Sequence, residues 1–195
     1  MKHFSLLLLL GICLCTSARA AELRGFLLTK DGYQLTGYLE VIQYSPTGNE
    51  IRFSNDFGDQ YVIHPFLVSG FGFSHDGMTY RFVSRFHGGQ WFFLQEQQAG
   101  RTLRLYSLPD GSQTWVDDRL LRLFTTPPAT YYLEYGKQQI VAVPRAGFRR
   151  TMRDFFNVVS PVMAQKVGTK GYRYRDISTI VAEVNEMNAR QRRRL

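Results

Sequence analysis

Short runs of β-forming residues, separated by glycine-containing turns, fill the chain up to Val143 and restrict its fold more than any other feature. Three Asp-Gly pairs, at 31–32, 76–77 and 110–111, stand between such runs. Asp-Gly supplies the positive φ angles of a tight hairpin turn, so runs on either side of it are expected to pair antiparallel. The predicted strands are Gly25–Thr29, Tyr33–Ile42, Ile51–Phe53, Tyr61–Ile63, Phe71–Phe73, Thr79–Phe86, Trp91–Gln97, Thr102–Tyr106, Gln113–Val116, Thr130–Tyr135 and Gln139–Val143.

Successive hairpins predict an antiparallel β-meander that either rolls into a barrel or packs as a sandwich. The intervals between the Asp-Gly pairs are unequal, so the pattern does not indicate a repeat architecture. Pro127-Pro128 is a candidate seam between two sub-sheets.

From Pro144 onward the apolar residues recur at helical spacing, which makes the predicted class α+β with a C-terminal segment of two or three helices. Pro144 is expected in the first turn of a helix, and Ser160-Pro161 should end that helix and begin a second, closing near Gly168. A third helix is expected from about Arg175 to Arg192. The apolar positions of the first and third helices are Phe148, Met152, Phe155, Phe156 and Val159, then Ile177, Ile180, Val181, Val184 and Met187.

The N-terminus has the three-part layout of a secretory signal peptide. Lys2 and His3 precede an apolar stretch that opens at Leu6, and Ala18-Arg19-Ala20 offers small residues before a cleavage point at Ala21. The alternative is a buried N-terminal helix. The apolar stretch is shorter than the ~20 residues of a membrane span, so no transmembrane segment is expected in the mature chain. The predicted organisation is a signal peptide at 1–20, a β-rich domain at 21–143 and a basic helical segment at 144–195.

Both cysteines, Cys13 and Cys15, lie inside the predicted signal. A mature chain without thiols forms no disulfide and must be held by its core alone. A lipid-anchored form stays open as a second interpretation, because either cysteine could be the modified residue. However, Ile12 and Leu14 stand before them, where a lipoprotein signal has a small residue.

Basic charge is concentrated in the C-terminal segment. Residues 21–143 hold 10 Lys/Arg and 12 Asp/Glu, a net charge of −2, whereas residues 144–195 hold 12 Lys/Arg and 4 Asp/Glu, a net charge of +8. Such asymmetry indicates either a solvated helix face or a segment that meets an anionic surface.

Several short motifs resemble a known group of proteins. Gly25, Asp31-Gly32 and Gly37-Tyr38 are followed by Ile51-Arg52-Phe53, Tyr61 and Ser69-Gly70-Phe71, and later by Tyr172-Arg173-Tyr174-Arg175-Asp176-Ile177, Ile180-Val181 and Asn185. The chain thereby resembles the uncharacterised exported proteins common in Bacteroidota. The resemblance implies an envelope location, periplasmic or associated with the outer membrane, in a Gram-negative cell. It implies no activity and transfers no catalytic residue.

No catalytic, cofactor or metal motif of useful specificity is present. His64, His75 and His87 do not have zinc-ligand spacing, and His87-Gly88-Gly89 is not accompanied by the G-x-S-x-G elbow of a hydrolase. The acid pairs Asp56/Asp59 and Asp117/Asp118 are sequence neighbours on turns and do not indicate two acids set across a cleft.

The sequence therefore predicts a non-catalytic binding or structural module of the cell envelope. The alternative is a hydrolase of an envelope polymer that would use the three histidines or nearby acids. Candidate partner-surface residues are the aromatics Trp91, Phe92 and Tyr132 and the terminal arginines Arg190, Arg192, Arg193 and Arg194. The expected partner is an envelope protein, a glycan or an anionic lipid surface rather than nucleic acid, because an exported protein does not meet nucleic acid in the envelope.

Overall fold

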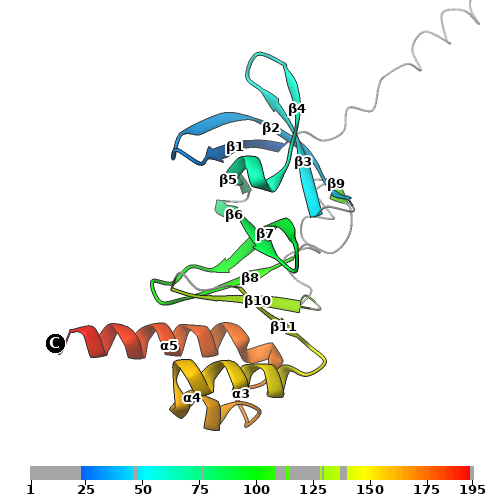
Figure 1. Cartoon of the computed structure of the whole chain (residues 1–195). Helices are drawn as coiled ribbons and strands as arrows, with labels where there is room; N and C mark the ends of the chain where they lie inside the picture. The colour runs from blue at the N-terminus through cyan, green and yellow to red at the C-terminus, as the bar shows by residue number, and fades with distance from the viewer. Residues whose placement is uncertain are drawn as a thin grey trace, which may run out of the picture.

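The chain forms a largely antiparallel sheet with a C-terminal layer of helices (Figure 1). The computed structural model describes residues 23–45, 48–75, 77–108, 113–114, 128, 130–136 and 140–193. The strands are β1 (Leu23–Thr29), β2 (Gln34–Ser45), β3 (Gly48–Asn55), β4 (Gln60–Ile63), β5 (Val68–His75), β6 (Met78–His87), β7 (Gln90–Gln98), β8 (Leu103–Ser107), β9 (Gln113–Thr114), β10 (Thr130–Tyr135) and β11 (Val141–Pro144). The helices are α3 (Phe148–Val159), α4 (Pro161–Lys166) and α5 (Ile177–Arg192), with 3-10 turns η1 (Pro65–Leu67) and η2 (Tyr174–Asp176).

Two meanders make up the sheet, whose strand order is β11-β10-β8-β7-β6-β5-β1-β2-β3-β4, with β9 added to β2. The meanders join where β1 pairs antiparallel with β5. A parallel contact between Gly48 of β3 and Trp91 of β7 links the two meanders a second time. The pairings among β1, β2, β3, β7, β6 and β5 therefore return to their starting strand.

The contact between β3 and β7 depends on a glycine and an asparagine. A Cβ on Gly48 would lie 1.9 Å from the carbonyl oxygen of Trp91, and its φ of +136° suits glycine. Next to it, buried Asn49 donates from Nδ2 to the Phe93 carbonyl (3.2 Å) and accepts at Oδ1 from the Phe93 N–H (2.7 Å). One side-chain amide thus satisfies both backbone groups of Phe93 on β7.

Strand β7 separates two apolar clusters because neighbouring residues on a strand point to opposite faces. Phe93 packs into one cluster, which we call the ring cluster because its residues come from the six strands joined by the returning pairings. Leu94 packs on the other face, against Tyr106, Tyr132 and Ile140. The ring cluster consists of Leu27, Leu39, Ile42, Ile51, Phe53, Val68, Phe71, Phe73, Phe82 and Phe93.

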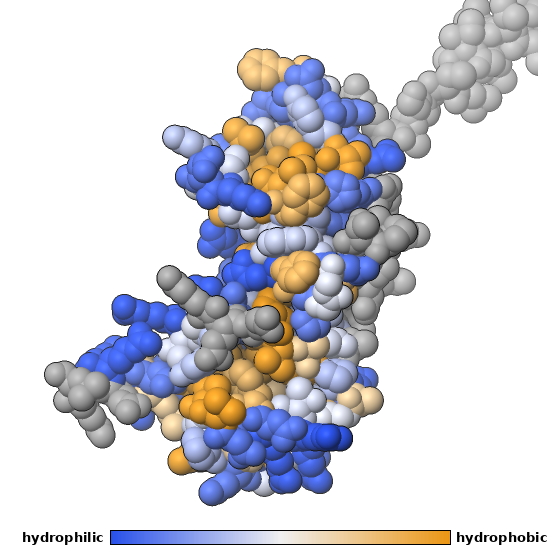
Figure 2. All heavy atoms as spheres, viewed as in Figure 1, coloured by the Kyte–Doolittle hydropathy of each residue, from blue (hydrophilic) through white to orange (hydrophobic). Residues whose placement is uncertain are grey.

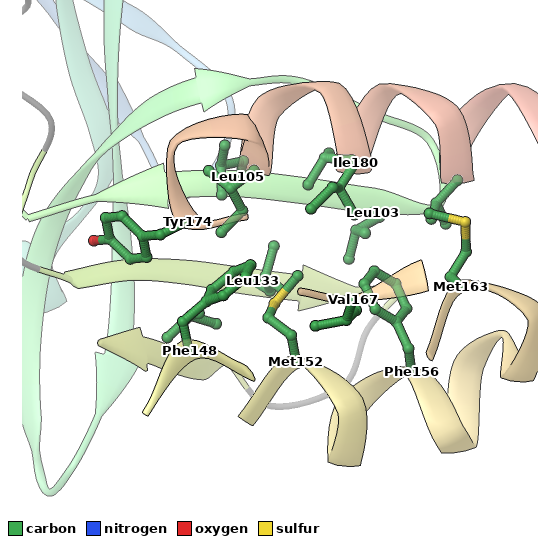
Figure 3. Packing of buried hydrophobic residues seen from close by; sticks show 14 of the residues in the cluster. Leu103, Leu105, Leu133, Phe148, Met152, Phe156, Met163, Val167, Tyr174 and Ile180 are labelled. Atoms are coloured by element: carbon green, nitrogen blue, oxygen red, sulfur yellow. The ribbon is translucent and has the colours of Figure 1, made fainter. Parts of the chain in front are cut away.

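A third cluster lies between the helices and β8, β10 and β11 (Figure 3). Leu103, Leu105 and Leu133 face the helices from the sheet. The predicted helical stripes supply the other side, since Phe148, Met152, Phe156, Ile177, Ile180, Val181 and Val184 are all buried. Met187, the last position of the predicted stripe, is instead 37% exposed.

Most predicted strands and all three predicted helices are confirmed, but the start of the helical segment is corrected. Pro144 is the last residue of β11, where it lies opposite Thr130, and not in the first turn of a helix. The helix begins at Phe148, after Gly147 has turned the chain with a φ of +89°. Asp110-Gly111 and Pro127 lie outside the described residues, as do the predicted signal peptide and both cysteines.

Candidate functional site

An open apolar pocket of about 450 Å³ lies between the β1–β2 and β3–β4 hairpins. Leu27 lies opposite Leu35 across β1 and β2, and Phe53 lies opposite Tyr61 across β3 and β4. Opposite residues are neighbours on one face of a sheet, so each pair contributes two adjacent side chains to the pocket. Leu27 and Phe53 are buried and form the floor, while Leu35 and Tyr61 are about half exposed at the rim. Figure 2 shows hydrophobic side chains gathered on the surface in this upper part of the molecule.

The β3–β4 turn holds Phe57 outward at the edge of this pocket. Asn55 Oδ1 accepts from the backbone N–H groups of Phe57 (3.0 Å) and Asp59 (2.9 Å), and Gly58 has a φ of +90°. The turn is thus fixed by its own hydrogen bonds. Phe57 nevertheless remains 93% exposed, the largest exposed fraction among the large apolar side chains of the described residues.

The rim is polar and includes one carboxylate, that of Asp56. Asp56 accepts a hydrogen bond from the Thr36 hydroxyl (2.6 Å) and forms an ion pair with Arg24 (3.3 Å). Over residues 23–75 the sequence contains five Asp/Glu and three Lys/Arg. This end of the molecule is therefore opposite in sign to the C-terminal segment.

Strand β4 borders the pocket and forms an edge of the sheet. It pairs with β3 and with no other described strand, and Gln60, Tyr61 and Val62 are exposed. The outward N–H and C=O groups of an edge strand can accept a further strand from another chain. An edge strand beside an apolar pocket is the arrangement by which many domains bind extended peptides.

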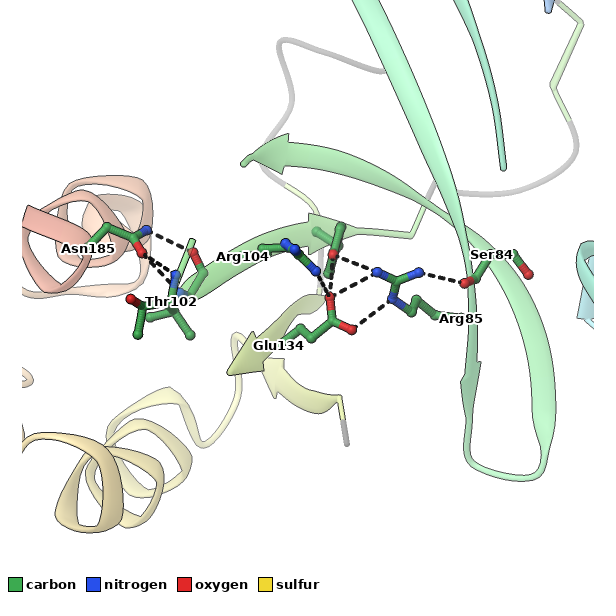
Figure 4. A network of polar contacts seen from close by, with 8 residues as sticks. Ser84, Arg85, Thr102, Arg104, Glu134 and Asn185 are labelled. Carbon is green, nitrogen blue, oxygen red and sulfur yellow. Dashed lines mark hydrogen bonds and ion pairs between the residues drawn. The ribbon is translucent and has the colours of Figure 1, made fainter. Parts of the chain in front are cut away.

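A second polar feature joins β6, β8 and β10 (Figure 4). Glu134 accepts from Arg85 through two hydrogen bonds of 3.0 Å, from Arg104 at 3.2 Å and from the Tyr106 hydroxyl at 2.5 Å. Burial alone would raise the pKa of Glu134, but the hydrogen bonds and charges of Arg85, Tyr106 and Arg104 outweigh it and hold that pKa below its usual range. Burial, with the hydrogen bond to Glu134, raises the pKa of Tyr106.

This ionic network lies beside a cavity of about 520 Å³, the largest of the three described here. Its walls include Arg85, Arg104 and Tyr106, together with the exposed Arg81 and Arg101. The Glu134 carboxylate is already occupied by three donors, so it is not placed to act as a general base. We interpret the network as a structural contact that fixes β6, β8 and β10 relative to one another.

The aromatic residues singled out from the sequence are covered to different degrees. Tyr132 is buried, with its ring 5.3 Å from that of His87, and Phe92 is half-buried against the same cluster. Trp91 is half-buried beside Phe86, at 5.5 Å between ring centroids. Tyr132 packs against Leu94, Tyr106 and Ile140 on one face of β10, whereas the helices cover the opposite face.

The terminal arginines lie at the end of α5. Arg190, Arg192 and Arg193 are exposed, and Arg190 forms an ion pair with Glu186 one turn earlier. Arg194 lies outside the described residues. Their role as a partner surface stays a prediction.

The histidines of the hydrolase alternative are dispersed. His64 pairs with Glu50 (3.1 Å), whereas His75 and His87 lie at opposite ends of the β5–β6–β7 meander, about 30 Å apart along β6. None of the three cavities described here is lined by a histidine. Within the described part of the chain, no three His, Cys, Asp or Glu residues come together in a way that could hold a metal ion.

Sequence reasoning missed Phe57, Tyr61 and Leu35 as surface residues. A signal for Phe57 was present, because a large aromatic between Asp56 and Gly58 occupies a turn where burial is difficult. No such signal existed for the pairing of Arg85 with Glu134, which are 49 positions apart.

No family model matches the chain, and no match is found among curated proteins or solved structures. Among the described helices, none combines the length and the apolar character that crossing a bilayer requires.

Proposed function

We propose that this chain is an exported envelope protein that acts without catalysis, as a module that binds an extended segment of a partner protein. The observation that carries this proposal is the apolar pocket beside the edge strand β4. The partner segment would add a strand to β4 and insert one large apolar side chain between Leu35, Phe57 and Tyr61.

Charge and shape favour this kind of occupant. The pocket has a buried apolar floor and lies in a part of the chain, residues 23–75, with two more acids than bases, so it suits an apolar side chain with neutral or basic neighbours. Backbone hydrogen bonds to β4 would supply affinity, and the pocket would supply specificity.

The envelope location rests on the N-terminal sequence and on the resemblance to exported proteins of Bacteroidota. Mass spectrometry of the native protein from a periplasmic or outer-membrane fraction should find Ala21 at the N-terminus. A cytosolic product that retains Met1 to Ala20 would contradict export, and a lipid on Cys13 or Cys15 would establish the anchored form.

We also propose that the ring of six strands is a small closed barrel whose open end is the pocket. The returning strand pairings and the apolar cluster within the ring support this description over a sandwich. Ligand pockets commonly occupy the mouths of such barrels.

Selection of displayed random peptides on the purified mature protein tests the binding proposal. We expect enriched peptides to have one large apolar residue among β-forming and basic residues. Their affinity should fall about tenfold or more in Tyr61→Ser, which corresponds to a loss of about 1.4 kcal/mol.

The matched control is Val62→Ser. Val62 is 51% exposed against 47% for Tyr61, and it points to the opposite face of β4. Hydrogen exchange should also slow in β4 when peptide is bound. Failure to enrich peptides, or equal loss of affinity in the Tyr61 and Val62 variants, would reject the pocket as the site.

A further inference from the structure

The C-terminal segment has basic side chains that form no ion pair with a carboxylate of the described residues. Each of its four acids is paired with one base: Asp154 with Arg150, Asp176 with Arg175, Glu183 with Lys166 and Glu186 with Arg190. The remaining described bases form no ion pair with a described residue: Arg145, Arg149, Arg153, Lys170, Arg173, Arg192 and Arg193. The excess positive charge of the segment therefore belongs to identifiable residues.

Three of these unpaired arginines converge on one cavity. Arg145, Arg149 and Arg173 line a hollow of about 380 Å³, with Phe148 and Tyr174 among its other lining residues. Small-molecule sites in proteins begin at about 300 Å³. The three arginines come from the turn before α3, from α3 itself and from the residue before η2, so the fold brings them together.

Two of the arginines are held in place by groups that leave their charge intact. Arg145 lies over the Tyr174 ring, 5.3 Å from its centroid, and Tyr174 is fixed by donating to the Pro128 carbonyl (2.6 Å). Arg149 donates to the Gly168 carbonyl at 3.4 Å. Neither contact supplies a negative charge, so both guanidinium groups remain available to an anion.

Gly168 is part of this arrangement. Its φ is +93°, and a Cβ placed there would lie 2.4 Å from Arg149 Nε. A side chain at this position would therefore displace the Arg149 guanidinium.

Asp176, three residues after Arg173, accepts from the Arg173 backbone N–H (3.0 Å) and pairs with Arg175 (3.7 Å).

We propose that this cavity binds a phosphomonoester. Arginine presents several N–H donors in a plane that matches two phosphate oxygens at once. Three cations without a carboxylate partner among the described residues favour a dianion, and a phosphomonoester is largely dianionic at pH 7 because its second pKa is about 6. The site is separate from the β4 pocket and does not depend on the function proposed for that pocket.

Calorimetric titration of the mature protein with glycerol 3-phosphate tests this site. We expect saturable binding that weakens below about pH 6, where the ligand loses its second charge. Arg149→Gln and Arg173→Gln should each lower the affinity about tenfold or more. Arg145→Gln is a third variant that keeps the test decisive if one of these fails to fold.

Arg150→Gln is the matched control. The substitution removes the same charge as Arg149→Gln, and Arg150 is adjacent to Arg149 but does not line the cavity. Its affinity should remain within about twofold of the native value. No binding to the native protein would overturn the proposal. An equal loss of affinity in the Arg149 and Arg150 variants would overturn it in favour of diffuse electrostatic attraction.

Vesicles distinguish the two sources of a phosphomonoester. Binding to phosphatidylcholine vesicles that contain phosphatidic acid, with competition by glycerol 3-phosphate, would assign the site to a lipid head group. Binding of glycerol 3-phosphate without vesicle binding would assign it to a soluble compound. Equal binding to phosphatidic acid and phosphatidylglycerol, unaffected by Arg149→Gln, would contradict a specific site.

Discussion

Asn185 on α5 hydrogen-bonds both backbone groups of Leu103, at the start of β8. Its Oδ1 accepts from the Leu103 N–H at 2.9 Å, and its Nδ2 donates to the Leu103 carbonyl at 2.8 Å. Strand β7 pairs with β8 only as far as Leu105, so the amide of Asn185 replaces the missing strand neighbour. The last helix is thereby tied to the sheet through the backbone as well as through the apolar cluster.

Replacing Asn185 with alanine should destabilise the protein by about 2 kcal/mol. The substitution removes this partner from the N–H and C=O of Leu103, and water can reach them only through the space of the half-buried Asn185 side chain. Urea denaturation measures the loss, and Asn157→Ala, on the exposed side of α3, should change stability by less than about 0.5 kcal/mol. Equal stability of the two variants would show that water satisfies Leu103.

Asn49→Ala should cost more than Asn185→Ala, about 3 kcal/mol. Asn49 is only 1% exposed, so water cannot reach the Phe93 groups that it satisfies. The same denaturation experiment ranks the two variants. A smaller loss for Asn49→Ala would contradict the role assigned to this residue in holding β3 against β7.

Glu134→Gln should destabilise the protein by about 2 kcal/mol at neutral pH, because Arg85 and Arg104 lose their shared counter-charge. The folded pKa of Glu134 is held below its ordinary value of 4.5, so its contribution is complete above about pH 4.5 and is lost as the pH falls through the folded pKa. The stability difference between native protein and variant should therefore shrink in acid.

Urea denaturation of both proteins across this pH range provides the measurement. Glu96→Gln is the control, since Glu96 lines the same cavity and forms no ion pair with a described residue. A difference between native protein and Glu134→Gln that stays constant down to the lowest pH would exclude the ionised carboxylate as the cause.

Phe156→Ala should cost about 3–5 kcal/mol, because it opens a cavity in the cluster between the helices and the sheet. Val158→Ala on the same helix should have an effect below about 0.5 kcal/mol, since Val158 is 82% exposed. Thermal or urea unfolding distinguishes the two. Similar losses in both variants would contradict the packing role of Phe156, because alanine favours the helix more than either residue and propensity alone predicts no loss.

The parts of the fold that the sequence predicted correctly are those set by neighbouring residues, namely turns and the buried faces of helices. Gly32 and Gly77 stand in turns with positive φ, as the Asp-Gly pairs predicted, and the spacing from Phe148 to Val184 identified the buried faces of α3 and α5. Pro144 misled because its fixed φ suits a strand end as well as a helix start.

Contacts between distant positions could not be predicted in the same way. The pairing of Gly48 with Trp91 and the hydrogen bonds from Asn49 to Phe93 depend on how two hairpins meet in space. The convergence of Arg145 and Arg173 likewise depends on the turns that bring η2 back to the start of α3. Sequence spacing contains no information about either, so the candidate sites emerged only from the fold.

Strand β7 lies between two apolar clusters, with Phe93 on one side and Leu94 on the other. Loss of β7 would therefore expose both clusters, so neither cluster can unfold while the other stays fully packed. Unfolding is expected to be cooperative over the whole described chain, with a single calorimetric transition. A fragment that ends before β7 would lack one side of its own interior and should not fold independently.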